Sequence, residues 1–244
     1  MSELTCRLLP FVAADGPRQM AVDEVLLEGA AAGIASFRLY SWSVPTLSLG
    51  YFQPAAVRLS DPLLKQLPYV RRVSGGATLV HDREVTYALA LPPGAPWQLR
   101  GDSWLRRMHG ILRDALAALG VDTRLYATER KLGGVLCFLH HTPNDLLLNE
   151  AKIAGSAQRK MRGSLLQHGS ILLAQSRHTP TLPGIAELTG ITISPEDFCV
   201  VYTEQLARAT GWLLQPDDWT ETEDRRAAAI AAAKYGHASW NDKR

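Results

Sequence analysis

Apolar positions recur along the chain with two spacings, and the spacing separates predicted helices from predicted strands. Apolar side chains at Met20, Val22, Leu26 and Leu27, after a proline that suits a first turn, predict an amphipathic helix. Similar periodicity, or a run of good helix formers, extends this prediction to further segments of the chain. Helices are predicted over residues 17–33, 103–120, 194–211 and 221–236, with one short helical turn inside 179–192.

Alternating or continuous apolar runs bounded by turn residues predict strands. Such runs predict single strands over residues 36–42, 46–53, 121–127 and 164–173. Two strands joined by a bend at a glycine pair are predicted within residues 68–93. A hairpin that turns at Asn149–Glu150 is predicted over residues 145–158. Most connections between strands are too short for helical crossovers, which favours an α+β fold with a mixed, mostly antiparallel sheet packed with helices. No change of composition marks a boundary, so we expect residues 1–244 to form one domain.

Composition and charge exclude several classes of protein. The chain is 46% hydrophobic and 20% charged, as in ordinary soluble proteins, and its net charge of +2 gives no argument for nucleic-acid binding. No signal peptide is evident, and no apolar run approaches the roughly 18 residues of a membrane span. Cys6, Cys137 and Cys199 are odd in number and widely spaced. They argue against a disulfide framework and for a reducing compartment, so we expect a cytoplasmic protein.

The segment RRVSGGATLVHD, residues 71–82, combines a glycine pair with two arginines. Gly75 and Gly76 leave the backbone open to close approach, and strand alternation sends Arg71 and Arg72 to opposite faces. Backbone amides and one guanidinium would suit a phosphate or carboxylate, although a hairpin turn with two solvated arginines fits the same residues. Neither a Walker loop nor a dinucleotide fingerprint is present.

Lys152 is a cation in a stretch that is otherwise small and apolar. Gly155, Ser156 and Ala157 follow it and leave the backbone bare, so a ligand chain could lie against this strand. The ammonium would then suit a carbonyl oxygen or a carboxylate. A lysine that simply faces water fits the strand alternation equally well.

Cys137 is the cysteine that lies neither near an end of the chain nor in a helical pattern. It follows Gly133 and Gly134, a predicted turn, and precedes His140 and His141, which could favour a nucleophilic thiolate. A small buried hydrophobe is the alternative, and it is the role we expect for Cys6 and Cys199. The Cys-x2-His-His cluster lacks a second ligand pair at zinc spacing, so we expect no metal site. His168 alone suggests a structural hydrogen bond, and His109 suggests the surface or the core edge.

Three segments, in this order, resemble one family. RRVSGGATLVHD resembles the arginine–glycine loop of the lipoate-protein ligases and octanoyltransferases, NDLLLNEAKIAGSAQ resembles their KIxGSAQ segment, and QHGSILL resembles their HHGTLL strand. MAVDEVLL, WSVPTLSLGYFQ and KYGHASWN extend the resemblance over nearly the whole chain.

The resemblance implies the α+β catalytic fold of biotin ligases and class II aminoacyl-tRNA synthetases, with an apolar tunnel for an acyl chain. It implies that Lys152 is the active-site lysine, which contacts the carbonyl end of the acyl group. The implied substrate-binding residues are Arg71, Ser74, Gly75, Gly76, Ala77, His81, Asn144, Asp145, Gly155, Ser156, Ala157, His168 and Gly169.

One group of octanoyltransferases in this family uses a cysteine before the KIxGSAQ segment, in a Cys-Phe pair followed some eight residues later by an acidic residue and leucine. Cys137-Phe138 and Asp145-Leu146 match that pattern. HDREVTYAL is closer to the HDxExTYS of this group than to the HDxGN of ligases, and Ala77 stands where ligases keep glycine. The length leaves no room for the C-terminal accessory domain of single-chain ligases.

The resemblance therefore implies that Cys137 takes an octanoyl (or lipoyl) group from acyl carrier protein and passes it to a lysine of a lipoyl domain, without a metal or ATP. The acceptors would be E2 subunits of 2-oxoacid dehydrogenases and the glycine cleavage H protein; nucleic acid and membrane are not expected partners. An ATP- and Mg²⁺-dependent lipoate-protein ligase, an amidotransferase that acts between lipoyl-bearing proteins, and a non-catalytic binding domain remain alternatives. The absence of a GRGRxGRxW-like segment disfavours a biotin ligase.

Overall fold

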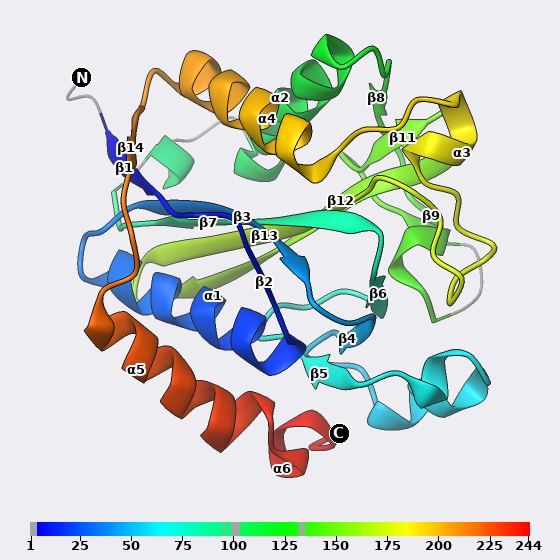
Figure 1. Cartoon of the computed structure of the whole chain (residues 1–244), viewed down its shortest axis with the longest axis horizontal. Helices are drawn as coiled ribbons and strands as arrows, with labels where there is room; N and C mark the ends of the chain where they lie inside the picture. The colour runs from blue at the N-terminus through cyan, green and yellow to red at the C-terminus, as the bar shows by residue number, and fades with distance from the viewer. Residues whose placement is uncertain (1–3, 95, 99–102, 132–134) are drawn as a thin grey trace.

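A large mixed sheet runs through the computed structural model, which describes residues 4–94, 96–98, 103–131 and 135–244 (Figure 1). Its strands lie in the order β14 (Leu213–Pro216), β1 (Thr5–Leu8), β3 (Ser36–Trp42), β7 (Glu84–Leu91), β13 (Ser164–Leu172), β12 (Ala151–Met161), β11 (Leu146–Leu148) and β8 (Arg124–Leu125), and β2 (Val12–Ala14) also pairs with β3. Neighbours from β3 to β8 are antiparallel, whereas β1 is parallel to both β14 and β3. The expected mixed, mostly antiparallel sheet is confirmed.

Helices cover both faces of this sheet. The longer helices are α1 (Gly16–Ala31), α2 (Trp104–Ala118), α4 (Pro195–Thr210) and α5 (Glu221–Ile230), and the shorter ones are α3 (Ile185–Thr189) and α6 (Ala238–Asn241). Figure 1 shows α2 and α4 on one side of the sheet and α1 and α5 on the other. Because side chains alternate along β7, Tyr87 and Leu89 pack with α2 and α4, whereas Ala88 and Ala90 pack against α1. Both faces of β7 are therefore buried.

The helix boundaries follow from the capping residues that the sequence offers. The Asp15 side chain accepts a hydrogen bond from the Arg18 amide at 2.9 Å at the start of α1, and Ser194 caps α4 by accepting from the Asp197 amide at 3.0 Å. Gly120 follows α2 with a φ of +82°, a conformation that favours glycine. The four predicted long helices are confirmed.

A small sheet carries the glycine loop, and here the sequence prediction is wrong. Residues 68–93 form three strands, β5 (Tyr69–Arg71), β6 (Leu79–His81) and β7, instead of two. Strands β5 and β6 do not pair with each other, because β4 (Thr46–Leu49) lies between them, parallel to β5 and antiparallel to β6. The glycine loop therefore crosses over β4 and is not a hairpin turn.

The predicted hairpin at 145–158 is confirmed, with β11 and β12 antiparallel and Asn149 turning at a φ of +53°. Two predicted strands are shorter than expected, since β4 ends at Leu49 and β8 has two residues. The remaining elements are β9 (Arg130–Lys131), β10 (His140–His141), η1 (Ala55–Ser60), η2 (Leu64–Gln66), η3 (Pro96–Gln98), η4 (Cys137–Leu139) and the π-helical turn η5 (Ala231–Tyr235). The predicted turn at Gly133 and Gly134 lies outside the described residues.

Across the described part of the chain, we find no helix with the length and apolar character needed to cross a membrane.

Candidate active site

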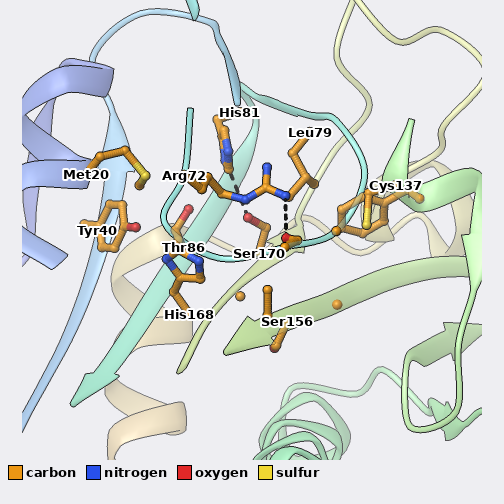
Figure 2. A pocket seen from close by; sticks show the side chains of 16 residues that line it. Met20, Tyr40, Arg72, Leu79, His81, Thr86, Cys137, Ser156, His168 and Ser170 are labelled. Carbon is orange, nitrogen blue, oxygen red and sulfur yellow. Dashed lines mark hydrogen bonds between the residues drawn. The ribbon is translucent and has the colours of Figure 1, made fainter. Parts of the chain in front are cut away.

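A pocket lies where the glycine loop and η4 approach strands β12 and β13 (Figure 2). Its lining is mostly apolar, and Cys137 lies on the opposite side of it from Met20 and Tyr40. Nine of the predicted site residues line it: Gly75, Gly76, His81, Cys137, Gly155, Ser156, Ala157, His168 and Gly169. The chain thus brings together four segments that are far apart in the sequence.

Two glycines of the pocket wall are required by close contacts. A Cβ atom on Gly169 would lie 2.2 Å from Ser156 Oγ and 2.8 Å from the Gly155 carbonyl oxygen. A Cβ atom on Gly155 would lie 2.6 Å from Cε of Lys152 and 3.0 Å from its Nζ. The missing side chains therefore give Ser156 and Lys152 the space that they occupy.

Lys152 is buried beside the pocket, with only 5% of its surface exposed. Its Nζ atom lies 2.8 Å from Asp145 Oδ2, 3.1 Å from the His140 carbonyl oxygen and 3.8 Å from Cys137 Sγ. An ammonium has three N–H donors, and these three contacts account for all of them. The contact to sulfur is the longest and the weakest, so the N–H directed at Cys137 is the one most readily given to another acceptor.

The carboxylate of Asp145, which pairs with Lys152, is itself held in place by hydrogen bonds from Thr142. It accepts hydrogen bonds from the Thr142 amide at 2.6 Å and from Thr142 Oγ1 at 3.0 Å. The preceding residue, Asn144, turns the chain with a φ of +77°. Asp145 and Asn144 are therefore placed behind the pocket wall, where they support Lys152, and they are not among the residues that line the pocket.

Cys137 lines the pocket at the start of η4, and its amide donates to the Thr78 carbonyl oxygen at 2.7 Å. A second buried cation, Arg72, also lines the pocket. Burial lowers the pKa of Arg72 to about 10, and the negative charge of a Cys137 thiolate opposes that shift. Because this pKa is still well above 7, the guanidinium stays charged at neutral pH. By contrast, burial raises the pKa of the Cys6 and Cys199 thiols to about 12, in keeping with their predicted role as small hydrophobes.

This arrangement places a cysteine thiol, an ammonium and an apolar pocket side by side, and the sequence carries the matching family pattern. Residues 15–182 match the model of the lipoyl protein ligase A/B catalytic domain. The chain belongs to this family of enzymes.

Curated relatives span the full length of the chain. An octanoyltransferase LipM of Kyrpidia tusciae is 31% identical, covering 97% of this chain and 98% of the relative. An octanoyltransferase LipM of Symbiobacterium thermophilum is 30% identical and covers 98% of each.

Solved structures share the fold. A lipoate-protein ligase A bound with ATP superposes with a TM-score of 0.79 at 20% identity, covering 98% of this chain and 99% of that one. A bipartite lipoate protein ligase of Thermoplasma acidophilum, described with its E2 lipoyl domain, gives a TM-score of 0.76 at 18% identity, covering 98% and 96%. At these identities the likeness establishes the fold of this lipoyl protein ligase A/B domain.

The arginine that faces the pocket of this lipoyl protein ligase A/B domain is Arg72, and the prediction of Arg71 is not supported by its position. Arg71 is fully buried and donates to backbone carbonyl oxygens, at 2.6 Å to Gln53 and at 3.0 and 2.8 Å to Asn241. Alternation along β5 sends it away from the pocket, into the segment after β4. Arg72 instead donates to the carbonyl oxygens of Gly75 and Ala77, so it holds the glycine loop from the inside.

His168 links the glycine loop to the first helix. Its Nε2 lies 2.5 Å from Ser74 Oγ and its Nδ1 lies 2.8 Å from Asp23 Oδ2. A carboxylate only accepts, so Nδ1 carries a proton and donates it to Asp23, while Nε2 is engaged by the Ser74 hydroxyl. Burial alone would raise the pKa of Asp23, but the charge of Arg38 and the bond from His168 lower it. Ser74 is placed behind the loop and does not line the pocket.

His81 occupies the side of the pocket nearer the small sheet. Its ring stacks on Trp42 with centroids 3.9 Å apart, Nδ1 lies 2.7 Å from Glu84 Oε1, and Nε2 lies 2.7 Å from Ser48 Oγ. Both ring nitrogens are engaged, so this histidine shapes the pocket and is held rigidly.

His109 lies behind the pocket wall and is among the residues that the sequence analysis did not assign to the site; the expectation that it lies at the surface or core edge is wrong. It is fully buried on α2, with Nδ1 2.5 Å from the Asn144 carbonyl oxygen and Nε2 2.5 Å from Ser156 Oγ. Because a carbonyl only accepts, Nδ1 carries the proton and the Ser156 hydroxyl donates to Nε2. The helical pattern held the signal, since His109 lies on the same face of α2 as the buried Leu112 and Leu116.

Ser156 thus contributes its backbone to the pocket, while its hydroxyl is bonded on the α2 side of the sheet. Tyr87 donates to Ser156 Oγ at 2.7 Å, and Gln167 donates to the Tyr87 hydroxyl at 2.7 Å. Burial lowers the pKa of His109, which keeps the imidazole neutral and able to accept. The chain of bonds joins the pocket wall to Asn144 and so to the residue that pairs with Lys152.

Proposed function

We propose that the protein transfers an octanoyl group from acyl carrier protein to the lysine of a lipoyl domain through a thioester on Cys137. Full-length relatives named octanoyltransferase support octanoyl transfer in protein lipoylation as the activity. The observation that carries the mechanism is the buried Lys152 ammonium 3.8 Å from the Sγ atom of Cys137, which lines an apolar pocket.

In the first step, the Cys137 thiolate attacks the carbonyl carbon of the octanoyl thioester. Lys152 and Arg72 supply positive charge near the sulfur, and such electropositive surroundings are typical of nucleophilic cysteines. As the S–C bond forms, charge builds on the carbonyl oxygen, and the Lys152 N–H that now faces the sulfur can donate to it. The intermediate then collapses, the bond to the carrier's sulfur breaks, and the carrier leaves as its thiolate, which takes a proton from water.

In the second step, the ε-amine of the acceptor lysine attacks the same carbonyl carbon. The new C–N bond gives the amide, the C–S bond to Cys137 breaks, and the amine's proton leaves as the thiolate is restored. Splitting the transfer in this way replaces one difficult displacement with two easier ones. The acceptors we propose are lipoyl domains of E2 subunits and the glycine cleavage H protein, in the cytoplasm.

The cycle as proposed balances without ATP or a metal, because the energy of the thioester drives the formation of the amide. The groups that support Lys152 are a carboxylate and a backbone carbonyl, and their role in this cycle is to orient the ammonium.

The test mixes the protein with octanoyl carrier protein and an apo lipoyl domain, and follows the mass of all three without ATP. We expect an octanoyl adduct on the enzyme that hydroxylamine removes, followed by octanoylation of the lipoyl domain; Cys137→Ala should lose both. The matched control is Cys199→Ala, which removes a thiol outside the pocket.

Two outcomes would replace this proposal. Modification of the lipoyl domain only with free lipoate, ATP and Mg²⁺, unaffected by Cys137→Ala, identifies a ligase. Transfer from an octanoylated H protein but not from octanoyl carrier protein identifies an amidotransferase that uses the same cysteine.

A further inference from the structure

Two aromatic side chains lie beside the glycine loop on the outside of the molecule. Tyr51 and Phe52 follow β4, and the Tyr51 amide donates to the Ser74 carbonyl oxygen at 2.9 Å. Phe52 is 70% exposed, and its Cδ2 lies 4.0 Å from the position of a Cβ atom on Gly75, which lines the pocket. A large apolar side chain is therefore exposed next to the loop that borders the pocket.

Three cations from other parts of the chain surround these rings. Lys243 Nζ lies 3.8 Å from the Tyr51 ring centroid, and Arg244 Cζ lies 5.2 Å from Tyr51 and 5.3 Å from Phe52. Arg159, on β12, lies 5.8 Å from Tyr51. We call Tyr51, Phe52, Arg159, Lys243 and Arg244 the basic patch. The chain after α6 reaches it because α6 packs against β5 (Figure 1).

The three cations of the basic patch are not held in ion pairs with side-chain carboxylates in the described part of the chain. Among the described residues, neither Arg159, Lys243 nor Arg244 forms an ion pair with a carboxylate, and the nearby Asp242 accepts a hydrogen bond from Tyr69 at 2.7 Å. The positive charge of the patch lowers the pKa of the exposed Tyr51 phenol, and the charge of Lys243 is the largest cause.

We propose that the basic patch docks the acidic face of the acyl-donor carrier protein and positions its thioester at the glycine loop; this inference rests on the proposed function. Arginine and an exposed aromatic residue are the residue types enriched at protein interfaces, and opposite charge steers a partner and fixes its orientation.

The charge of the two protein substrates favours the donor over the acceptor. The donor's acyl chain hangs from a prosthetic group that carries a phosphate, so its linker, like the acidic face that we propose for the carrier, would be attracted to cations. The acceptor presents a lysine, whose ammonium the basic patch would repel. Since Phe52 adjoins Gly75, a carrier seated on the patch would place its linker beside the pocket.

The experiment separates docking from chemistry by using two donors and two half-reactions. The test variants are the double charge reversal Arg159→Glu with Lys243→Glu, and separately Phe52→Ala. The control is Arg106→Glu, an exposed arginine on α2, which packs on the other face of the sheet. Formation of the acyl-enzyme is timed by mass with octanoyl carrier protein and with octanoyl-pantetheine, and preformed acyl-enzyme is then mixed with an apo lipoyl domain.

We expect the charge reversal to slow acylation by octanoyl carrier protein by about tenfold at low salt and to flatten its salt dependence. Phe52→Ala should slow the same step without changing its salt dependence. Acylation by octanoyl-pantetheine, transfer to the lipoyl domain and the melting temperature should stay at wild-type values, as should every rate of Arg106→Glu.

Three results would overturn the docking proposal. Unchanged acylation by the carrier protein removes the patch as its site, an equal loss with octanoyl-pantetheine assigns the residues to the pocket, and a loss confined to the second half-reaction makes the patch the acceptor's site. If wild-type enzyme forms no acyl-enzyme even with octanoyl-pantetheine, the proposed function fails first and the docking proposal with it.

Discussion

Replacing Lys152 with methionine tests the ion pair and the proposed chemistry at once. The substitution keeps an unbranched side chain, one heavy atom shorter, but leaves Asp145 as a buried carboxylate without its cation. Removing one partner of a buried pair costs about 3–5 kcal/mol. Asp145 keeps two hydrogen bonds from Thr142, at 2.6 and 3.0 Å, so we expect the loss to fall near 3 kcal/mol.

A second variant separates stability from chemistry. Lys152→Met with Asp145→Asn removes both charges, and we expect its unfolding free energy to return to within about 1 kcal/mol of the wild type. Its octanoyl transfer should nevertheless stay about 100- to 1,000-fold slower, because no ammonium meets the charge that develops on the carbonyl oxygen. The control is Lys160→Met, an exposed lysine on the same strand, which should change neither quantity appreciably.

The measurements are urea unfolding for stability and single-turnover mass spectrometry for the rate. Two results would refute the reasoning. A stable double variant that transfers octanoate at the wild-type rate would mean that the ammonium stabilises no developing charge. A single variant as stable as the wild type would mean that the carboxylate does not depend on its partner.

Three further predictions concern the residues around the pocket. Gly169→Ala should cost about 1–3 kcal/mol in urea unfolding, since the added Cβ would lie 2.2 Å from Ser156 Oγ; an unchanged midpoint would contradict that contact. His109 has a lowered pKa, so the stability of the wild type should decline as the pH falls below the ordinary value of 6.5. His109→Gln should flatten that decline. Equal slopes of stability against pH in the two proteins would count against a buried neutral imidazole. The lowered pKa of Asp23 contributes stability that is present above pH 3.8 and is lost as the pH falls through the pKa of the folded protein. Arg38→Met should raise the pKa of Asp23 and make this acid-induced loss of stability smaller. An unchanged stability curve at acid pH would exclude the pairing of Asp23 with Arg38.

Local patterns predicted much of the fold and many of the pocket residues. The long helices follow from apolar periodicity and caps, and the 145–158 hairpin follows from a turn next to its own strands, so each depends on residues close in sequence. The glycines at 75, 76, 155 and 169 line the pocket. The resemblance of three ordered segments to one family predicts them as a set, whereas the residues alone left a plain turn or strand as the alternative.

Features that depend on distant pairing were not predicted. Strand β4 pairs with β5 on one side and with β6 on the other, so it lies between them. Strand β1 pairs with β14, which lies some 200 residues later in the chain. Strand alternation predicts that either Arg71 or Arg72 points toward the pocket, but it does not predict which. The pairing of β5 with β4 in the small sheet decides which side of this segment faces the pocket. His109 was misplaced because its partners lie on β12 and in the turn before β11.

The glycine wall also limits how the slot can be remodelled. Where Gly155 and Gly169 border it, the slot is bounded by main chain, whose spacing is fixed by the hydrogen-bonded ladder between β12 and β13. No substitution can remove atoms from such a boundary; a side chain added at Gly155 would crowd Lys152, and one added at Gly169 would meet Ser156 Oγ on the α2 side of the sheet. A variant enzyme that accepts a longer fatty chain must therefore gain its extra room at the far end, where trimming Met20 would lengthen the cavity without touching the strands.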